Sequence, residues 1–351
     1  MSFRDRFQNL KETVGQWTDS SVSGSLDRKI ERNLAEMESG TEIERTAAIK
    51  ALVIQAQIDD KWTDPIITSF LRVLSDQLAS PQEAIIDGLL ELRKVKVSRE
   101  EEIFESIQET LDSPYPSVRS KVVDIWTRFS LKSDIKASDA IAVLFEMLSD
   151  DDKDVRYQTQ ESLSKVLHTV PKVALPELKN AIGDDDWRVT YHSIVLLTEF
   201  AKKYPAPSVA LAPEVISAFN SGERLKERAA DCIGMLGLAN PEAVKPAVPG
   251  LIKGLESKSS ELRKACATAL GRIGSKNGMI VYHAVPRLAR ALKNDDWYIH
   301  VEVAKALGYI GSNKPALVKP HLDIIRNRTT TGADRNICKA AEWALKKAGG
   351  G

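Results

Sequence analysis

The side chains best suited to chemistry in this sequence are clustered carboxylates, five histidines and three cysteines. The aspartates of Asp150–Asp152, with Asp154, and of Asp184–Asp186 could bind calcium or magnesium, which prefer carboxylate oxygens. Each cluster, however, lies in a turn just before an apolar-periodic segment. An aspartate there caps the next helix and favours its dipole. We therefore expect helix caps at both clusters rather than a metal site.

The histidines and cysteines show no ligand or nucleophile pattern. No histidine forms a spaced set with cysteine or aspartate. Cys232, Cys266 and Cys338 lack C-x-x-C spacing, which predicts buried apolar side chains in a reducing compartment. The sequence has no G-x-S-x-G, Walker or dinucleotide-binding motif. We expect no catalytic residue, no metal and no cofactor; an enzyme would need a deep polar pocket with a perturbed acid or base.

A second set of candidates combines basic and aromatic residues in the last third of the chain. Its members are Lys264, Arg272, Lys305, Tyr309, Lys339, Trp343 and Lys347. Such a set could receive an acidic protein segment or follow a phosphate backbone. An ordinary solvated helix face would carry similar charges. The choice depends on the elements that position these side chains.

Those elements are pairs of short helices, and the clearest pair spans residues 243–274. Val248, Leu251, Ile252 and Leu255 fall at i, i+3, i+4 and i+7, so they share one helix face. Leu262, Cys266, Leu270 and Ile273 repeat this spacing, and Gly274 is predicted to end the second helix. A single pair of this size cannot bury its apolar stripe, so it requires neighbouring pairs.

The same pattern recurs along the chain at intervals of 34 to 38 residues. The reference positions, at the start of each second helix, are Arg45, Gln82, Arg119, Arg156, Thr190, Lys226, Arg263, His300 and Cys338. Seven residues after each lies a large apolar side chain: Leu52, Leu89, Trp126, Leu163, Leu197, Ile233, Leu270, Leu307 and Leu345. This register establishes an internal repeat. Gly234, Gly271 and Gly308 fall within second helices, where a close helix crossing would offset their cost.

The repeat resembles the HEAT repeat, as in SSELRKACATALGRIG (259–274) and NDDWYIHVEVAKALGYIG (294–311), and is similar to the short-repeat branch that includes the phycobilin lyases. The resemblance covers residues 26–348 and implies an all-α fold, an α-solenoid superhelix of about nine hairpins. It also implies structural roles in an aspartate–arginine ladder for Asp112, Asp150, Arg119, Arg156 and Arg263. Glu44 and Pro81 break the apolar pattern in the first two units, which are therefore expected to be irregular or capping.

Two further features test the repeat. Trp187 and Trp297 both lie three residues before a reference position, which favours packing between hairpins over ligand stacking. In a solenoid the second helices line the concave side, so the basic and aromatic candidates at offsets +1, +5 and +9 would lie there.

Residues 1–18 predict an amphipathic N-terminal helix, followed by a linker at 19–25 and the solenoid at 26–351. The apolar stripe of this helix comprises Phe3, Phe7, Leu10, Val14 and Trp17. It could cap the open end of the first repeat, dock on a partner or bind a membrane surface. The sequence leaves these three roles open.

Charge and hydropathy limit the partners. The chain has 49 basic and 49 acidic residues, but residues 1–150 carry a net charge of −8 and residues 221–351 a net charge of +10. No apolar run is long enough to span a bilayer, so we expect a soluble cytoplasmic protein without a membrane partner.

We expect a non-catalytic scaffold or adaptor that binds a protein or peptide on its concave face. The alternative is a solenoid that binds nucleic acid through its basic C-terminal part. The sequence does not specify an oligomeric state.

Overall fold

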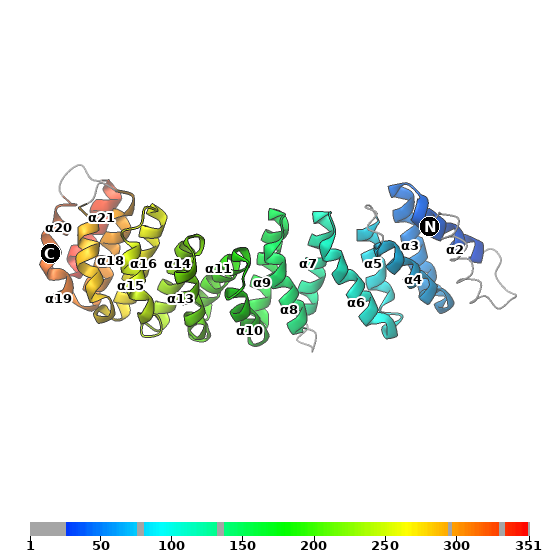
Figure 1. Ribbon diagram of the computed structural model, residues 1–351, viewed down its shortest axis with the longest axis horizontal. Helices are drawn as coiled ribbons and strands as arrows, with labels where there is room; N and C mark the ends of the chain where they lie inside the picture. Colours follow the sequence, from blue (N-terminus) through cyan, green and yellow to red (C-terminus); the bar gives the residue numbers. More distant parts are fainter. Residues whose placement is uncertain (1–25, 76–80, 132–136, 294–296, 330–333, 350–351) are drawn as a thin grey trace. The chain divides into compact units, whose positions relative to one another are not determined.

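Successive helix pairs build the whole of the described structure. The computed structural model describes residues 26–75, 81–131, 137–293, 297–329 and 334–349, which contain helices and turns and no β-strand (Figure 1). Nine helix pairs lie within these ranges. The helices group into two units, the first ending at Ile125 and the second beginning at Trp126. The predicted all-α repeat architecture is confirmed.

The first unit contains three pairs, with α7 crossing its boundary. Its helices are α2 (Leu26–Ser39), α3 (Glu42–Ile58), α4 (Thr63–Ser75), α5 (Gln82–Leu92), α6 (Glu100–Glu109) and α7 (Pro116–Ser130). Three short 3-10 turns adjoin two of them: η1 (Asp60–Trp62) precedes α4, η2 (Val97–Arg99) precedes α6, and η3 (Thr110–Asp112) follows α6. The second members of the pairs are α3, α5 and α7, and α3 packs on α5.

The second unit contains six pairs whose first members are often interrupted. The second members are α9 (Lys153–Thr169), α11 (Trp187–Lys203), α14 (Glu223–Ala239), α16 (Ser260–Lys276), α18 (His300–Asn313) and α21 (Arg335–Lys347). The first members are α8 (Ala137–Glu146), α10 (Pro171–Ile182), α12 (Pro205–Ser208) with α13 (Ala212–Ser221), α15 (Val248–Gly254), α17 (Val285–Ala291) and α19 (Pro315–Val318) with α20 (Leu322–Arg326). Between them lie η4 (Met147–Ser149), η5 (Val209–Leu211), η6 (Lys245–Ala247), η7 (Gly278–Ala284), η8 (Trp297–Ile299) and η9 (Lys319–His321).

Local sequence sets where several second helices begin. Thr41 and Glu44 form a capping box at α3, in which each side chain accepts a hydrogen bond from the other residue's backbone N–H. The hydroxyl of Ser259 accepts from the Leu262 N–H at the start of α16. Glu44 breaks the apolar pattern because it serves this box, and it is exposed.

The predicted core stripe is buried in both units. The nine apolar residues at offset +7 are at most 9% exposed, and seven of them, such as Leu163 and Leu270, are 0% exposed. At about 25 cal/mol per Å² of apolar surface, such burial is the main source of stability in the stack. The periodicity of the sequence therefore located the core correctly.

Four reference residues share a role that the sequence did not specify. Each side chain donates a hydrogen bond to the carbonyl oxygen six residues earlier, in the turn between the two helices of its pair. These donor and carbonyl residues are Arg119 with Ser113 (2.6 Å), Arg156 with Asp150 (2.5 Å), Thr190 with Asp184 (3.0 Å) and Arg263 with Ser257. These bonds satisfy carbonyls left unpaired where the first helix ends, so they fix the turn within one pair.

Glycines bring neighbouring second helices into close contact in the second unit. A Cβ atom on Gly271 would lie 2.7 Å from the Cα atom of Ala306, and one on Gly234 would lie 2.8 Å from that of Ala269. The predicted close crossing is confirmed. The prediction that Gly274 ends its helix is wrong, because α16 continues to Lys276 and a Cβ on Gly274 would overlap the side chain of Ile310. Gly274 is thus a second point of close packing, one turn beyond Gly271.

The predicted N-terminal helix at 1–18, its stripe of Phe3, Phe7, Leu10, Val14 and Trp17, and the linker at 19–25 lie outside the described residues. Among the helices that the structure describes, none has the length and apolar character needed to cross a bilayer.

Candidate functional site

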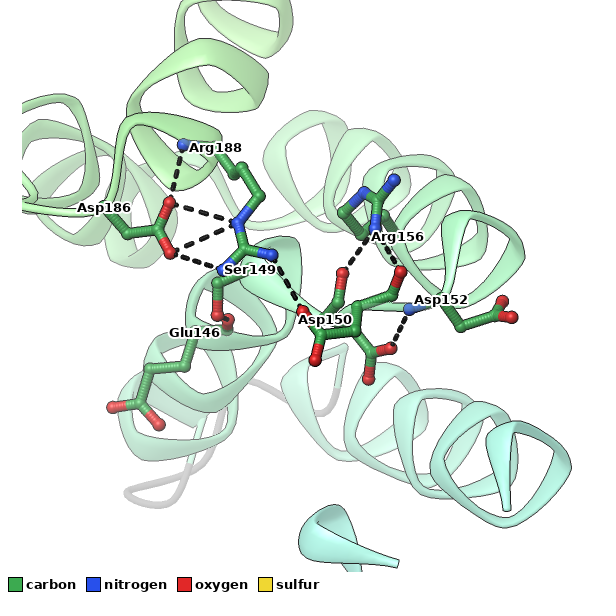
Figure 2. Close-up of polar contacts among 8 residues, drawn as sticks. Glu146, Ser149, Asp150, Asp152, Arg156, Asp186 and Arg188 are labelled. Atoms are coloured by element: carbon green, nitrogen blue, oxygen red, sulfur yellow. Dashed lines mark hydrogen bonds and ion pairs between the residues drawn. The ribbon is translucent and has the colours of Figure 1, made fainter. Parts of the chain in front are cut away.

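One aspartate of each cluster caps a helix, as the sequence predicted, and Figure 2 shows the cap at Asp186. The Asp152 carboxylate accepts hydrogen bonds from the Asp154 and Val155 N–H groups at 2.8 and 3.2 Å, at the start of α9. The Asp186 carboxylate accepts from the Arg188 N–H at 2.8 Å, at the start of α11. These oxygens are therefore engaged by helix N-termini.

Arg188 joins the two clusters. Its guanidinium lies 2.9 Å from Asp186 (Figure 2). It also lies 3.0 Å from Asp151 of the preceding pair. The hydrogen bond from the Arg188 side chain holds the pKa of Asp186 below its usual value. An aspartate–arginine contact between repeats therefore exists, but its arginine lies two residues before the reference position Thr190.

Asp186→Ala is expected to lower the free energy of unfolding by about 1 kcal/mol at pH 7, because it removes a cap and a partner of Arg188. Since folding lowers the pKa of Asp186, its contribution is present above the unfolded value of 3.8 and is lost as pH falls through the folded value. Urea unfolding at pH 7 and pH 3 should show the gap to the wild type shrinking at low pH. The exposed Asp185→Ala control should match the wild type at both pH values; a constant gap for Asp186→Ala would contradict the assignment.

Burial determines the properties of two cysteines and one histidine. Burial raises the pKa of the Cys232 and Cys266 thiols to about 12, so both stay protonated and inert. The prediction of a buried thiol is wrong for Cys338, which is partly exposed. The His192 ring nitrogen lies 2.6 Å from the Gln160 side-chain oxygen, and burial lowers its pKa. In the described part of the chain, no three His, Cys, Asp or Glu side chains are grouped to hold a metal ion.

Five of the seven basic and aromatic candidates line two adjoining hollows on the second helices of the second unit. One hollow of about 510 Å³ lies between α18 and α21 and includes Lys305, Lys339 and Trp343. The other, of about 270 Å³, lies between α16 and α18 and includes Arg272. Both include Glu302, Lys305 and Tyr309. We call this continuous surface the C-terminal groove.

An aromatic pair forms one wall of the C-terminal groove. The rings of Tyr309 and Trp343 meet edge to face, with centroids 5.0 Å apart. Trp343 lies against Gly308, where a Cβ atom would overlap its ring. Tyr309 is 43% exposed and Trp343 is partly exposed. The wall is therefore a fixed apolar edge that a ligand could contact without first ordering it.

The charges of the C-terminal groove are mostly positive and partly compensated. Lys305 lies 3.7 Å from the Glu302 carboxylate, and Arg272 donates to the carbonyl oxygen of Asp231 at 3.4 Å. Burial raises the pKa of Asp231, although Arg272 and its other cationic neighbours oppose the rise. Lys339 is exposed at the rim. The lining of the two hollows thus contains three cations, Arg272, Lys305 and Lys339, and one carboxylate, Glu302.

The two remaining candidates lie outside the lining of the C-terminal groove. The Lys264 ammonium lies 4.9 Å from the centre of the Tyr298 ring, and its hydrogen bond to that hydroxyl raises the Lys264 pKa. Lys347 is exposed near the end of α21. Glu302 also lines both hollows, although it is not at offset +1, +5 or +9 and was not predicted from the sequence. Glu302 lies at offset +2, and no pattern in the sequence indicates that a side chain at this offset faces a hollow.

The two matching tryptophans behave differently. The Arg224 guanidinium of the next pair lies over the Trp187 ring, 4.8 Å from its centre, so Trp187 makes a contact between hairpins although it is 43% exposed. Trp297 is 67% exposed, and the prediction of a packed side chain is wrong at that position. It meets the Tyr298 ring edge to face at 6.3 Å instead.

Comparisons with known proteins agree with this architecture. Curated protein sequences give no match to the chain. A solved engineered protein is 18% identical, with a TM-score of 0.54 over 99% of this chain and 95% of that chain. Kap121p bound to Nup53p is 14% identical, with a TM-score of 0.57 over 99% of this chain and 42% of that chain. Kap121p bound to the extreme C-terminus of the protein phosphatase Cdc14p gives the same values. The chain thus spans about two fifths of Kap121p. At these low identities, the TM-scores show a shared fold and nothing more.

A sequence model of HEAT repeats matches residues 104–198 and 248–346, which together make up more than half of the chain. The matched regions contain six of the nine buried residues at offset +7 and the charged and aromatic residues named for the C-terminal groove. The chain therefore belongs to the HEAT-repeat family.

Proposed function

We propose that this protein is a non-catalytic scaffold that holds an acidic peptide segment of a partner protein in its C-terminal groove. The observation that carries the proposal is the convergence of Arg272, Lys305 and Lys339, from three helices, around the Tyr309–Trp343 wall. An acidic segment with one apolar side chain would complement both parts of this surface. Kap121p, which shares the fold, has been solved with bound protein partners.

Two features of the groove favour a peptide over a nucleic acid. Glu302 faces both hollows and interrupts their positive charge. A nucleic acid carries a negative charge at every phosphate, whereas a peptide can place an uncharged residue opposite this carboxylate. The Trp343 ring is held edge to face by Tyr309 and lies against Gly308, which restricts its use as a stacking platform for bases. The net charge of +10 over residues 221–351 favours the competing nucleic-acid function, so the experiment must separate the two.

Lys305→Glu with Lys339→Glu is expected to weaken binding of a labelled Asp/Glu-rich peptide bearing one phenylalanine by about tenfold, or 1.4 kcal/mol. Fluorescence anisotropy at two salt concentrations measures this, and the wild-type affinity should fall as salt screens the charges. The matched control is Lys314→Glu with Lys319→Glu, which makes the same charge change at exposed sites on the α19–η9 segment. It should bind like the wild type.

Unchanged binding by the groove variant, or an equal loss in the control, would contradict the proposal. Single- and double-stranded oligonucleotides form the other arm of the titration. If they bind more tightly than the peptide and the groove variant abolishes that binding, the nucleic-acid function replaces the peptide function.

A further inference from the structure

The first unit carries a hollow at the same repeat positions as the C-terminal groove but with the opposite charge. It has a volume of about 610 Å³ and lies on the second helices α3, α5 and α7. Offsets +1, +5 and +9 give Thr46, Lys50 and Ile54 on α3, and Glu83, Asp87 and Glu91 on α5. All six line the hollow, which we call the N-terminal groove. Equivalent helix faces thus line a groove in each unit, with mainly acidic residues in the first unit and mainly basic residues in the second.

The α5 wall of the N-terminal groove is an acidic stripe. Glu83, Asp87 and Glu91 are four residues apart, so they lie one above another on the helix, and all three are exposed. Asp87 pairs with Lys121 of α7 at 2.6 Å, and Glu91 pairs with Lys94 at 2.8 Å. The carboxylates keep 65% and 50% of their side-chain surface exposed in these pairs. Such exposed ion pairs contribute little stability, so a cation of a ligand can replace Lys121 or Lys94 as the partner of these carboxylates.

The α3 wall of the N-terminal groove is apolar at its outer edge. Ile54 lines the groove and is 57% exposed, above the partly exposed Val53 and the buried Ile49. Ile43 and Ile58 are 81% and 76% exposed. Because a helix turns by 100° per residue, these two isoleucines lie within about 40° of Ile54 around α3. Ile43, Ile54 and Ile58 thus form an apolar stripe along α3, which the exposed Lys50 interrupts and of which Ile54 lines the groove.

We propose that the N-terminal groove binds a short amphipathic basic peptide of a partner protein. Its lysine or arginine side chains pair with Glu83, Asp87 and Glu91, and its large apolar side chains cover Ile54 and the neighbouring α3 stripe. Charge complementarity selects this occupant, because Glu42 adds a fourth carboxylate to a lining whose cations are Lys50 and Lys121. This site is independent of the C-terminal groove and requires a partner of the opposite charge.

The test uses the full chain and a fluorescein-labelled peptide with lysines on one helix face and leucines on the other. Glu83→Gln with Asp87→Asn should weaken binding about tenfold. The matched control is Glu101→Gln with Glu105→Gln, two exposed carboxylates with the same spacing on α6, which should leave binding unchanged. Ile54→Ser leaves every charge in place and should weaken binding about fivefold, as a purely electrostatic site would not. Circular dichroism of each variant confirms that the helices are retained.

Three results would overturn the proposal. The first is equal affinity for the amphipathic peptide and for an oligolysine of the same length, which would reduce the interaction to charge alone. The second is equal binding by the wild type and the α5 variant. The third is a tenfold gain in affinity on Phe7→Ala with Trp17→Ala, which would identify the chain's own N-terminal segment as the occupant. A failure of acidic peptides at the C-terminal groove would leave this site untouched, so the two proposals fail separately.

Discussion

Gly271→Val is expected to lower the free energy of unfolding of the second unit by about 3 kcal/mol, at the upper end of overpacking costs. The added Cβ would lie 2.7 Å from the Ala306 Cα and 2.9 Å from its Cβ, both well inside van der Waals contact. The nearest atom belongs to the backbone of α18, so no side-chain rotation relieves the overlap. The two helices must separate, and that opens the apolar contacts on either side of them.

A matched substitution separates this packing effect from the general properties of glycine. A Cβ atom on Gly222 would meet nothing within 4 Å, and the φ of −164° at this residue is extended backbone that any residue adopts. Gly222 is the N-cap residue of α14, where glycine is preferred over alanine. Because restriction of the unfolded chain offsets part of this loss, Gly222→Ala should cost less than about 1 kcal/mol. Chemical denaturation followed by circular dichroism measures both variants. A Gly271→Val midpoint equal to that of the wild type would show that α16 and α18 are not in close contact.

The glycines also show why part of the fold could be predicted and part could not. The stripe at offset +7 follows from periodicity, because every repeat must bury the same helix face, and Leu52 and Leu307 lie in the core as predicted. Gly274 was assigned by local propensity, which favours glycine just after a helix end. Contact with Ile310, in the next repeat, decides the role of Gly274 instead. The recurrence of G-x-x-G in three successive repeats was the signal for close packing.

Some residues of the two grooves could likewise be predicted from the sequence, and others could not. Residues at offsets +1, +5 and +9 line both the N-terminal and the C-terminal groove. These offsets therefore predicted that Lys305, Tyr309 and Trp343 are neighbours. Only basic and aromatic residues in the last third of the chain were predicted as candidates. Glu83, Asp87 and Glu91, which occupy the same offsets on α5, were therefore not predicted. Glu302 could not be placed from its offset. Whether a side chain at +2 reaches a hollow depends on the distance between adjacent helices, which non-local packing determines.

Leu270→Ala is expected to destabilise the second unit by about 3 kcal/mol, from the lost transfer free energy and the cavity left behind. Leu270 is 0% exposed on α16, and this helix packs against both α14 and α18. The Leu131→Ala control removes the same atoms from a side chain that is 36% exposed and should cost less than about 1 kcal/mol.

The distribution of the Leu270→Ala effect tests the repeat architecture itself. In a stack of repeats, stability is approximately a sum of each repeat's own contribution and the coupling to its neighbours. Hydrogen exchange should therefore accelerate most in α14, α16 and α18, while α9, several repeats away, keeps most of its protection. An equal loss of protection from α9 to α21 would mean that the unit opens as one cooperative block. The hairpins would then not behave as separable repeats, although the buried stripe would still account for their stability.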